Sequence, residues 1–599
     1  MKPEIKNCQN CKKEFVIEQE DFNFYEKIQV PPPTWCPECR LIRRLNSIRD
    51  RCLYKDFCAL CKKNIISTLN PEDNFIVYCN KCWWGDGWDP LDYGLKLDFS
   101  KPFLKQFIEL QKKAPYPATD NRNCDNCDYC DTTLRCKDCT LTFGGFQSIN
   151  SHYCETVAFG HDLLDCDIVF NGANSYETIN SNGVYNTRFV YFSDECLDSA
   201  LLFNCIGCSD CFGCVNLRNQ KFCIFNKQYS KEEYKKEIKK WDLRSYKTIL
   251  EAKEKFWELY YKTPRRFALI LNSTNVSGDD IKNTKNCKNC FATRHGVENC
   301  KNIFTCGLLL KDSQDTTTGG DTSELFYETA SCLESQRVMF SHGTVNCRDV
   351  EYSNRIYNCS NCFGCTMLKN KKYCILNKQY TKEEYEQLVF KIKKHMDDFP
   401  YLDKKERIYK YGEFLPSDHP LWVYNESWGN QFSPKTKEEA LEEGYLWREP
   451  LKKDYKITIN SEKLPDSINE VKDSILEEVI ECAHSTSSGQ AHKGECNEQC
   501  TTAFRILPYE LEFYRSMGLA LPHLCFSCRY YQRLKIINLP KLYHRKCMCA
   551  GGKSQSGEYK NTIEHFHKDK PCQNEFETAI SDERKEMVYC KECYQAEFI

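Results

Sequence analysis

Short apolar runs alternate with clusters of Asn, Ser, Gly and Asp through the middle of the chain. Runs such as CDIVFNG (166–172), TRFVYFS (187–193) and SALLFNC (199–205) are typical of short strands joined by tight turns. This spacing predicts the half-coils of a β-solenoid stacked one above another, with Cys and Phe laddered inside, because aromatic residues recur at multiples of eleven. The residues that carry the spacing are Phe159, Phe170, Phe192 and Phe203.

Helical patterns occupy the segments between and after these strand-rich regions. Apolar groups at helical spacing in residues 244–262 predict a helix that bridges two central units. A hydroxyl residue followed three positions later by Glu predicts a capped helix at the end of each unit, opening at Ser230 and Thr381. Further helices are expected within 386–481, one opening at Thr436 and another across 469–480.

Two internal duplications organise the chain. Residues 211–234 repeat as 362–385, at an offset of 151, and the surrounding cysteines follow the same offset. The two ends of the chain match at a different offset of 489, which aligns Phe15 with Phe504 and Arg40 with Arg529. The ends and the middle are therefore each built from two copies of one unit.

Cysteine pairs with the spacing of metal ligands lie at both ends. The chain has 42 cysteines, and sixteen of them fall into four sets, three made of two closely spaced pairs and the fourth of one such pair with Cys547 and Cys572. Two such turns bring four thiolates together as a tetrahedral zinc site, and about four zinc ions are expected. The predicted ligands are Cys8, Cys11, Cys36 and Cys39; Cys58, Cys61, Cys79 and Cys82; Cys496, Cys500, Cys525 and Cys528; and Cys547, Cys572, Cys590 and Cys593.

These sets indicate structural metal sites rather than catalytic ones. Four thiolates leave no open coordination position, so the ion would stabilise folding. The runs CRLIRRLNSI and CRYYQRLKII after the last pairs predict that the second knuckle opens a helix, as in a treble clef. The competing interpretation is a set of buried free cysteines. In the fourth set an insertion from Met548 to Pro571 holds Cys549, His565 and His567, and Cys549 is the alternative to Cys547 as first ligand.

The expected fold class is multidomain α+β, with treble-clef or zinc-ribbon modules at both termini flanking a duplicated, cysteine-rich, mainly β centre that is a candidate β-solenoid. The predicted segments are zinc module 1 (1–50), zinc module 2 with a helix (51–115), β repeat 1 (120–243), a helical bridge (244–275), β repeat 2 (280–396), a helical or mixed linker domain (397–481), zinc module 3 (482–536) and zinc module 4 (537–599).

The central cysteines have three competing interpretations. Twenty-three of the 42 lie between Cys124 and Cys374, and the run from Cys205 to Cys214 has a cysteine at every third position. Such a run suggests an iron–sulfur cluster, but Ile356 stands where the second copy should repeat Cys205, and no Pro follows Cys214. The alternatives are extra zinc ligands, or cysteine as a small apolar filler of a narrow β core.

Basic residues near the zinc modules suggest a nucleic-acid surface. Residues 513–557 contain eight Lys or Arg and no Asp or Glu, with aromatic residues between them, which suits phosphate contact and base stacking. Contact with a protein through the same modules is the alternative, and the arginines also suit a role in covering the zinc-bound thiolates. The candidate nucleic-acid-binding residues are Arg40, Arg43, Arg44, Arg529, Arg533, Lys535 and Arg545.

Charge and motifs limit the remaining classes of protein. The net charge of −2 excludes a uniformly basic coat. No phosphate-binding loop, dinucleotide fingerprint, zinc-protease or nucleophile-elbow motif is present, so no catalytic residue and no small-molecule substrate is identified. The absence of an apolar signal core or membrane-length stretch predicts a cytoplasmic protein without membrane contact, in which cysteines are metal ligands rather than disulfides.

A family resemblance rests on these motifs. The pattern C-x2-C-x3-F, a Phe-Tyr pair, Pro and C-x2-C-R, at 8–44 and again at 496–533, resembles probable zinc-ribbon domains of the treble-clef type. With CWWGDGWDP (82–90) and the CFGC segments, the whole chain is similar to large, uncharacterised, cysteine-rich multi-zinc-ribbon proteins of candidate-phyla bacteria. The resemblance implies zinc binding and no particular biological role.

Overall fold

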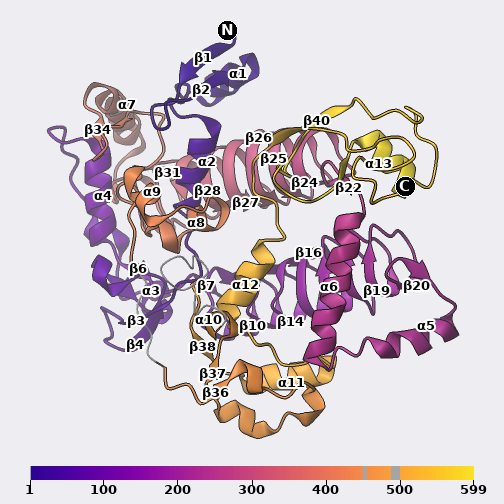
Figure 1. Ribbon diagram of the computed structural model, residues 1–599. Coiled ribbons are helices and arrows are strands. Elements are labelled where there is room, and N and C mark those ends of the chain that lie inside the picture. Colours follow the sequence, from indigo (N-terminus) through magenta and orange to yellow (C-terminus); the bar gives the residue numbers. More distant parts are fainter. Residues whose placement is uncertain (1, 450–454, 487–498) are drawn as a thin grey trace. The chain divides into compact units, whose positions relative to one another are not determined.

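A computed structural model describes residues 2–449, 455–486 and 499–599 of the chain (Figure 1). The chain forms two compact units, and each draws on distant parts of the sequence. Unit 1 comprises Met1–Thr119, Ala268–Glu449 and Leu539–Leu542, and unit 2 comprises Asp120–Phe267, Pro450–Asn538 and Tyr543–Ile599. The two N-terminal zinc modules therefore share a unit with the second β repeat, and the two C-terminal modules share a unit with the first.

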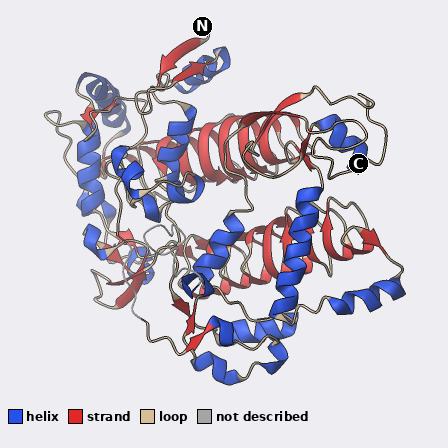
Figure 2. Ribbon diagram, in the orientation of Figure 1, coloured by secondary structure: helices blue, strands red, loops and turns tan. Residues whose placement is uncertain are grey.

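The first β repeat, in unit 2, is a β-solenoid made of short parallel strands (Figure 2). Each strand pairs with the chain twelve residues further on, as Val157 does with Val169 and Cys211 with Cys223. An antiparallel strand, β21 (Lys227–Gln228), closes the end. The parallel strands are β7 (Asn121–Arg122), β8 (Asp125–Asp128), β9 (Thr133–Leu134), β10 (Lys137–Thr140), β11 (Phe143–Phe146), β12 (Ile149–His152), β13 (Glu155–Ala158), β14 (His161–Leu164), β15 (Asp167–Phe170), β16 (Ala173–Asn182), β17 (Tyr185–Tyr191), β18 (Ala200–Phe203), β19 (Ser209–Val215) and β20 (Lys221–Ile224).

The second β repeat, in unit 1, is a matching solenoid. Its coil length varies along the chain. The first pairings are one residue shorter than twelve, since Thr274 pairs with Lys285; the next coils are one residue longer, since Cys287 pairs with Cys300; and later coils return to twelve, since Cys362 pairs with Cys374. The strand β33 (Lys378–Gln379) closes it in antiparallel fashion. Its parallel strands are β23 (Ile270–Leu271), β24 (Thr274–Lys282), β25 (Lys285–Arg294), β26 (Glu298–Gly307), β27 (Gln314–Gly320), β28 (Glu324–Leu333), β29 (Gln336–His342), β30 (Arg348–Glu351), β31 (Ser360–Phe363) and β32 (Lys372–Ile375).

Each twelve-residue coil consists of four three-residue repeats. Left-handed backbone recurs at every third position, for example at Asp162, Asp165 and Asn171, which explains the abundance of Asn and Asp, residues that tolerate this conformation. Residues that follow such corners, such as Leu163 and Cys166, are fully buried in the solenoid core. Four corners close one coil, so its interior accepts one small side chain on each side.

The coil length of twelve residues differs from the spacing of eleven residues that the phenylalanines predicted. The core of the first solenoid consists of Cys, Val and Leu at positions three apart, and no Phe belongs to it. Phe159 lies at a corner and is 47% exposed, while Phe203 is buried from outside by helix α6 (Tyr246–Lys262), where its ring lies 4.7 Å from that of Tyr260. In the first solenoid cysteines are therefore laddered inside and phenylalanines are not, whereas the core of the second solenoid includes the fully buried Phe326.

Most of the expected helices are present. Helix α6 lies along the first solenoid, and α5 (Lys231–Glu237) and α7 (Lys382–Asp398) follow the last coils, with capping boxes at Ser230 and Thr381. Helix α9 (Lys437–Glu442) opens at Thr436. The helix expected across 469–480 is wrong, because that segment makes two 3-10 turns and then places Ile480 in a strand that pairs with Phe504.

None of the helices in the described part of the chain combines the length and apolar character needed to cross a bilayer.

Candidate metal centres

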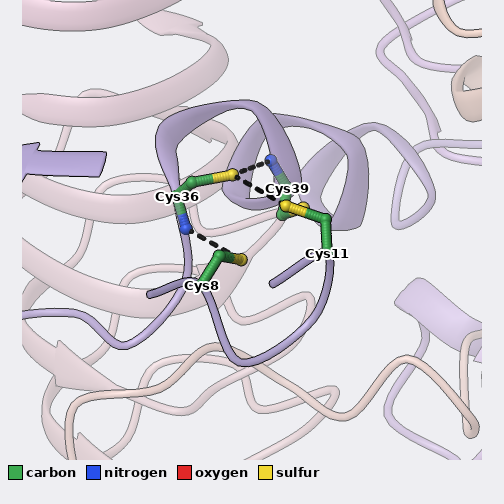
Figure 3. A group of neighbouring side chains, drawn as sticks. All are labelled: Cys8, Cys11, Cys36 and Cys39. Atoms are coloured by element: carbon green, nitrogen blue, oxygen red, sulfur yellow. Dashed lines mark hydrogen bonds between the residues drawn. The ribbon is translucent and has the colours of Figure 1, made fainter. Parts of the chain in front are cut away.

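The first zinc module gathers four cysteines from a hairpin and a helix (Figure 3). Cys8 and Cys11 lie in the turn between β1 (Glu4–Asn7) and β2 (Glu14–Ile17), and Cys36 and Cys39 begin helix α2 (Pro37–Leu45). All four Sγ atoms lie within 4.8 Å of one another, and those of Cys11 and Cys36 are 3.8 Å apart. A zinc ion bound through bonds of about 2.3 Å requires sulfur atoms about 3.8 Å apart, so the geometry fits a tetrahedral ion.

The second module repeats this arrangement. Cys58 and Cys61 lie between β3 (Tyr54–Phe57) and β4 (Asn64–Ser67), and Cys79 and Cys82 begin helix α3 (Asn80–Trp84). The Cys61 and Cys79 Sγ atoms are 3.8 Å apart. Burial opposes ionisation of Cys58, but backbone N–H groups of Cys61 and Cys79 donate to its sulfur at 3.4 and 3.2 Å and lower its pKa to about 6. The backbone thus favours the thiolate that a metal binds.

The third module differs from the predicted set in its first ligand. The structure brings together Cys482, Cys500, Cys525 and Cys528, and the predicted ligand Cys496 lies outside the described residues. The Sγ atoms of Cys482 and Cys528 are 3.8 Å apart, and Cys525 precedes helix α12 (Phe526–Leu534).

The position of Cys482 in a hairpin explains why it belongs to the third four-cysteine group. Cys482 directly follows β37 (Ile480–Glu481), which pairs with β38 (Ala503–Phe504), just as Cys8 follows β1 and precedes β2. Cys482 is therefore the counterpart of Cys8, with an insertion before the second ligand. The fourth module has an insertion at the same place, between its first two cysteines, and this was the sequence signal that could have identified Cys482.

The fourth module also combines a hairpin and a helix. Cys547 follows β39 (Tyr543–Lys546), Cys572 precedes β40 (Glu575–Thr578), and Cys590 and Cys593 begin helix α13 (Lys591–Phe598). The Sγ atoms of Cys572 and Cys590 are 3.9 Å apart, and the Cys590 N–H donates to Cys547 Sγ at 3.2 Å. Cys549 lies in a neighbouring group of donors and not in this one.

The arginines of the first module point into the second solenoid. Arg40, Arg43 and Arg44 are at most 3% exposed. Arg40 Nη2 lies 2.8 Å from Asp315, and Arg43 Nη2 lies 2.9 Å from Glu328. Arg44 Nη1 approaches both of these carboxylates, at 3.3 and 3.5 Å. These side chains are the counter-charges of buried carboxylates, so they do not form the basic surface that the sequence suggested.

The third module makes the same contact with the first solenoid. Arg529 Nε lies 2.7 Å from Asp165, and Arg533, which is 1% exposed, pairs with Asp165 and Asp167. Glu510 is also buried beside Arg529, and burial raises its pKa to about 7. Arg529 and Arg533 are thus buried, and their partners are carboxylates of the solenoid.

Asp165 and Asp315 occupy equivalent places in the two solenoids. Leu164, before Asp165, pairs with Tyr176, and Gln314, before Asp315, pairs with Tyr327, which is the residue that the offset of 151 aligns with Tyr176. The duplicated helices and the duplicated solenoids therefore preserve one ion-pair arrangement in both units.

The rest of the basic stretch is largely paired as well. Arg545 is buried and its Nε lies 2.9 Å from Asp582. Lys546 pairs with Glu575 at 3.0 Å, and Arg515 pairs with Asp473 at 2.8 Å. Of the seven residues predicted to bind nucleic acid, Lys535 is exposed and the other six are buried.

The central cysteines form no metal cluster in the described residues. Five groups of metal-ligating side chains occur there, and none includes a cysteine between Cys124 and Cys374. Cys205, Cys208 and Cys211 lie on successive sides of one coil, and each thiol donates to the carbonyl oxygen two residues before it, at 3.6, 3.6 and 3.4 Å. These contacts support the role of core filler, since Ser and Thr make the same bond at equivalent positions, as Ser175 does to Ala173 at 2.9 Å.

Replacing one core cysteine by serine should therefore leave the metal content unchanged. In Cys211→Ser the hydroxyl can bond to the Ser209 carbonyl, so we expect the free energy of unfolding to fall by only about 1 kcal/mol. Elemental analysis and denaturant unfolding of the variant test this. Loss of zinc or iron from the variant would show that Cys211 is a metal ligand.

No family model matches the chain, and comparison with curated proteins finds no match. The class of protein rests on the fold and the four cysteine clusters, which are consistent with zinc-binding modules.

Proposed function

We propose that this protein is a non-enzymatic, zinc-dependent binding scaffold. The observation that carries the proposal is the presence of four complete four-cysteine groups, each of which places two Sγ atoms 3.8 or 3.9 Å apart without an intervening disulfide. Such sites are closed, so the metal stabilises structure. We also propose that the chain is related to the multi-zinc-ribbon proteins of candidate-phyla bacteria that its cysteine motifs resemble.

Zinc in these sites would hold the solenoids as well as the modules. The last ligands of modules 1 and 3 lie at the start of α2 and α12, and the arginines that neutralise buried solenoid carboxylates follow them on the same helices. Metal binding would hold helices α2 and α12 in place, and the arginines of these helices neutralise the buried carboxylates of the solenoids. The solenoids then present long polar surfaces suited to binding a partner.

A protein partner is favoured over a nucleic acid by the distribution of charge. A groove of about 680 Å³ runs along five coils of the second solenoid, and its lining mixes Lys311 and Arg348 with Glu324 and Glu334. A polyanion requires a surface of one sign. A mixed lining suits the backbone and varied side chains of a polypeptide.

The expected result with nucleic acid is therefore an absence of salt-sensitive binding. Fluorescence anisotropy of the full chain with labelled single-stranded RNA, single-stranded DNA and duplex DNA, from about 0.05 to 0.2 M salt, measures this. Binding that weakens steeply with salt, and weakens further in Lys535→Glu but not in the control Lys27→Glu, would restore the nucleic-acid interpretation.

Elemental analysis of the purified protein tests the scaffold itself. We expect at least four zinc ions per chain and no stoichiometric iron. Iron would revive an iron–sulfur or redox function for the central cysteines, and protein that is folded but free of zinc would overturn the proposal.

A further inference from the structure

The insertion in the fourth module provides a second set of metal ligands beside the first. Cys549, His565 and His567 come from the segment between Cys547 and Cys572, which the corresponding second module lacks. These three side chains converge on Cys593, which is already a member of the four-cysteine group. The two groups therefore share one sulfur atom.

The donor atoms of this second set have the separations of a metal site. The four atoms lie within 4.8 Å of one another. Cys549 Sγ lies 3.2 Å from His565 Nδ1, and Cys593 Sγ lies 3.2 Å from His567 Nε2. Zinc bonds of about 2.3 Å to sulfur and 2.0 Å to nitrogen place such atoms about 3.5 Å apart in a tetrahedron, within a few tenths of an ångström of these distances.

Each imidazole is oriented by a hydrogen-bond acceptor on its far side. His565 Nε2 lies 2.9 Å from the Glu597 carboxylate, with both side chains fully buried. His567 Nδ1 lies 2.6 Å from the carbonyl oxygen of Lys570. A far nitrogen that faces an acceptor carries the proton, so the near nitrogen presents a lone pair to the sulfur atoms. This is the arrangement of carboxylate or carbonyl, histidine and metal that orients zinc ligands in proteins.

The remaining ligand is also held by its surroundings. Asn561 Nδ2 donates to Cys549 Sγ at 3.1 Å, and the Tyr589 hydroxyl donates to Asn561 Oδ1 at 2.9 Å. Glu597 in turn accepts from the N–H of Thr562 at 3.0 Å. The insertion therefore supplies ligands together with the groups that orient them.

We infer that the fourth module is a dinuclear zinc site in which the Cys593 thiolate bridges two ions. One ion is bound by Cys547, Cys572, Cys590 and Cys593, and the second by Cys549, His565, His567 and Cys593. The inference rests on the proposed zinc binding of the first group. Sulfur and imidazole donors favour zinc over the oxygen-seeking cations.

The net charge of the site favours a Cys593 sulfur that is shared by two zinc ions. A single ion on four thiolates leaves a net charge of −2 in a buried place, whereas five thiolates, two Zn²⁺ ions and two neutral imidazoles leave −1. Both sites are complete with four protein ligands, so the second ion is also structural. The described residues then provide sites for five zinc ions and not four.

Native mass spectrometry of the intact protein, purified in the presence of zinc, counts these ions. We expect five zinc ions in the wild type and four in His565→Ala/His567→Ala. The control variant His544→Ala, which removes an exposed histidine of the same module, should keep five. Four ions in the wild type, or five in the double variant, would overturn the dinuclear site while leaving the scaffold proposal intact, and a count near zero would defeat both.

A second measurement does not depend on folding of a variant. Zinc X-ray absorption spectra of the wild type should contain the scattering of two imidazoles distributed over five ions, together with zinc–zinc scattering through the bridging sulfur. The ¹¹³Cd-substituted protein should show two resonances coupled to each other through Cys593. Spectra with sulfur ligands alone, or five uncoupled cadmium signals, would contradict the bridge.

Discussion

Removal of zinc is expected to unfold all four modules and to loosen both solenoids. Structural zinc contributes about 10–16 kcal/mol of apparent binding free energy per site, which exceeds the typical stability of about 5–15 kcal/mol of a whole domain. Without metal, each cysteine group becomes a cluster of thiols with no bond between them, and helices α2 and α12 lose the knuckles that position them. We expect a strong chelator to lower the melting temperature greatly and to expose the modules to proteolysis.

Circular dichroism and limited proteolysis with and without the chelator measure this effect. A matched pair of substitutions separates ligands from core cysteines: Cys525→Ser should lose one zinc and destabilise unit 2, whereas Cys211→Ser should keep all of the zinc. Added zinc should restore the chelated wild type. A metal-free protein with an unchanged melting temperature would show that the cysteine groups are only buried thiols.

Replacement of Arg533 by alanine should give the largest effect of any substitution outside the metal ligands. Arg533 is 1% exposed, and Asp165 and Asp167 beside it are equally enclosed. Removing the cation leaves two carboxylates buried with less counter-charge, and breaking a buried ion pair in this way costs about 3–5 kcal/mol. Denaturant unfolding of Arg533→Ala measures the loss.

The control for this substitution is Arg515→Ala. Arg515 also pairs with an aspartate in unit 2, but its side chain is 42% exposed and that of Asp473 is 79% exposed, so the loss should be below about 1 kcal/mol. The zinc content of Arg533→Ala should remain that of the wild type, because Arg533 binds solenoid carboxylates and not the metal. Equal stability of the two variants would contradict a clamping role for the buried arginines.

Local spacing in the sequence was sufficient to find most of the four-cysteine groups. In modules 1, 2 and 4 the predicted cysteines are those that the structure brings together, because a knuckle and a helix start place ligands by short-range geometry. Cys482 was missed because an insertion separates it from Cys500, and the hairpin pairing of Ile480 with Phe504 reveals its place. The second donor group was missed because Cys549, His565 and His567 lack a regular spacing.

The coil length of the solenoids and the partners of the arginines could not be predicted from the sequence. A β-solenoid could be expected from short strands and tight turns, but its coil length could not be read from the phenylalanines, because the inward positions carry Cys, Ser, Val and Leu instead. Arg529 appeared in the sequence among other cations, and its partner Asp165 lies 364 residues away. Charge neutralisation between such distant residues depends on the tertiary fold, so a basic stretch in the sequence became a buried network in the structure.

Anomalous scattering at the zinc absorption edge, from crystals of the full chain, would locate the bound zinc ions directly. We expect one peak within each four-cysteine group, a further peak between Cys549, His565, His567 and Cys593, and none inside either solenoid. Absence of zinc from the four-cysteine groups, or a metal peak among the cysteines between Cys205 and Cys214, would contradict this expectation.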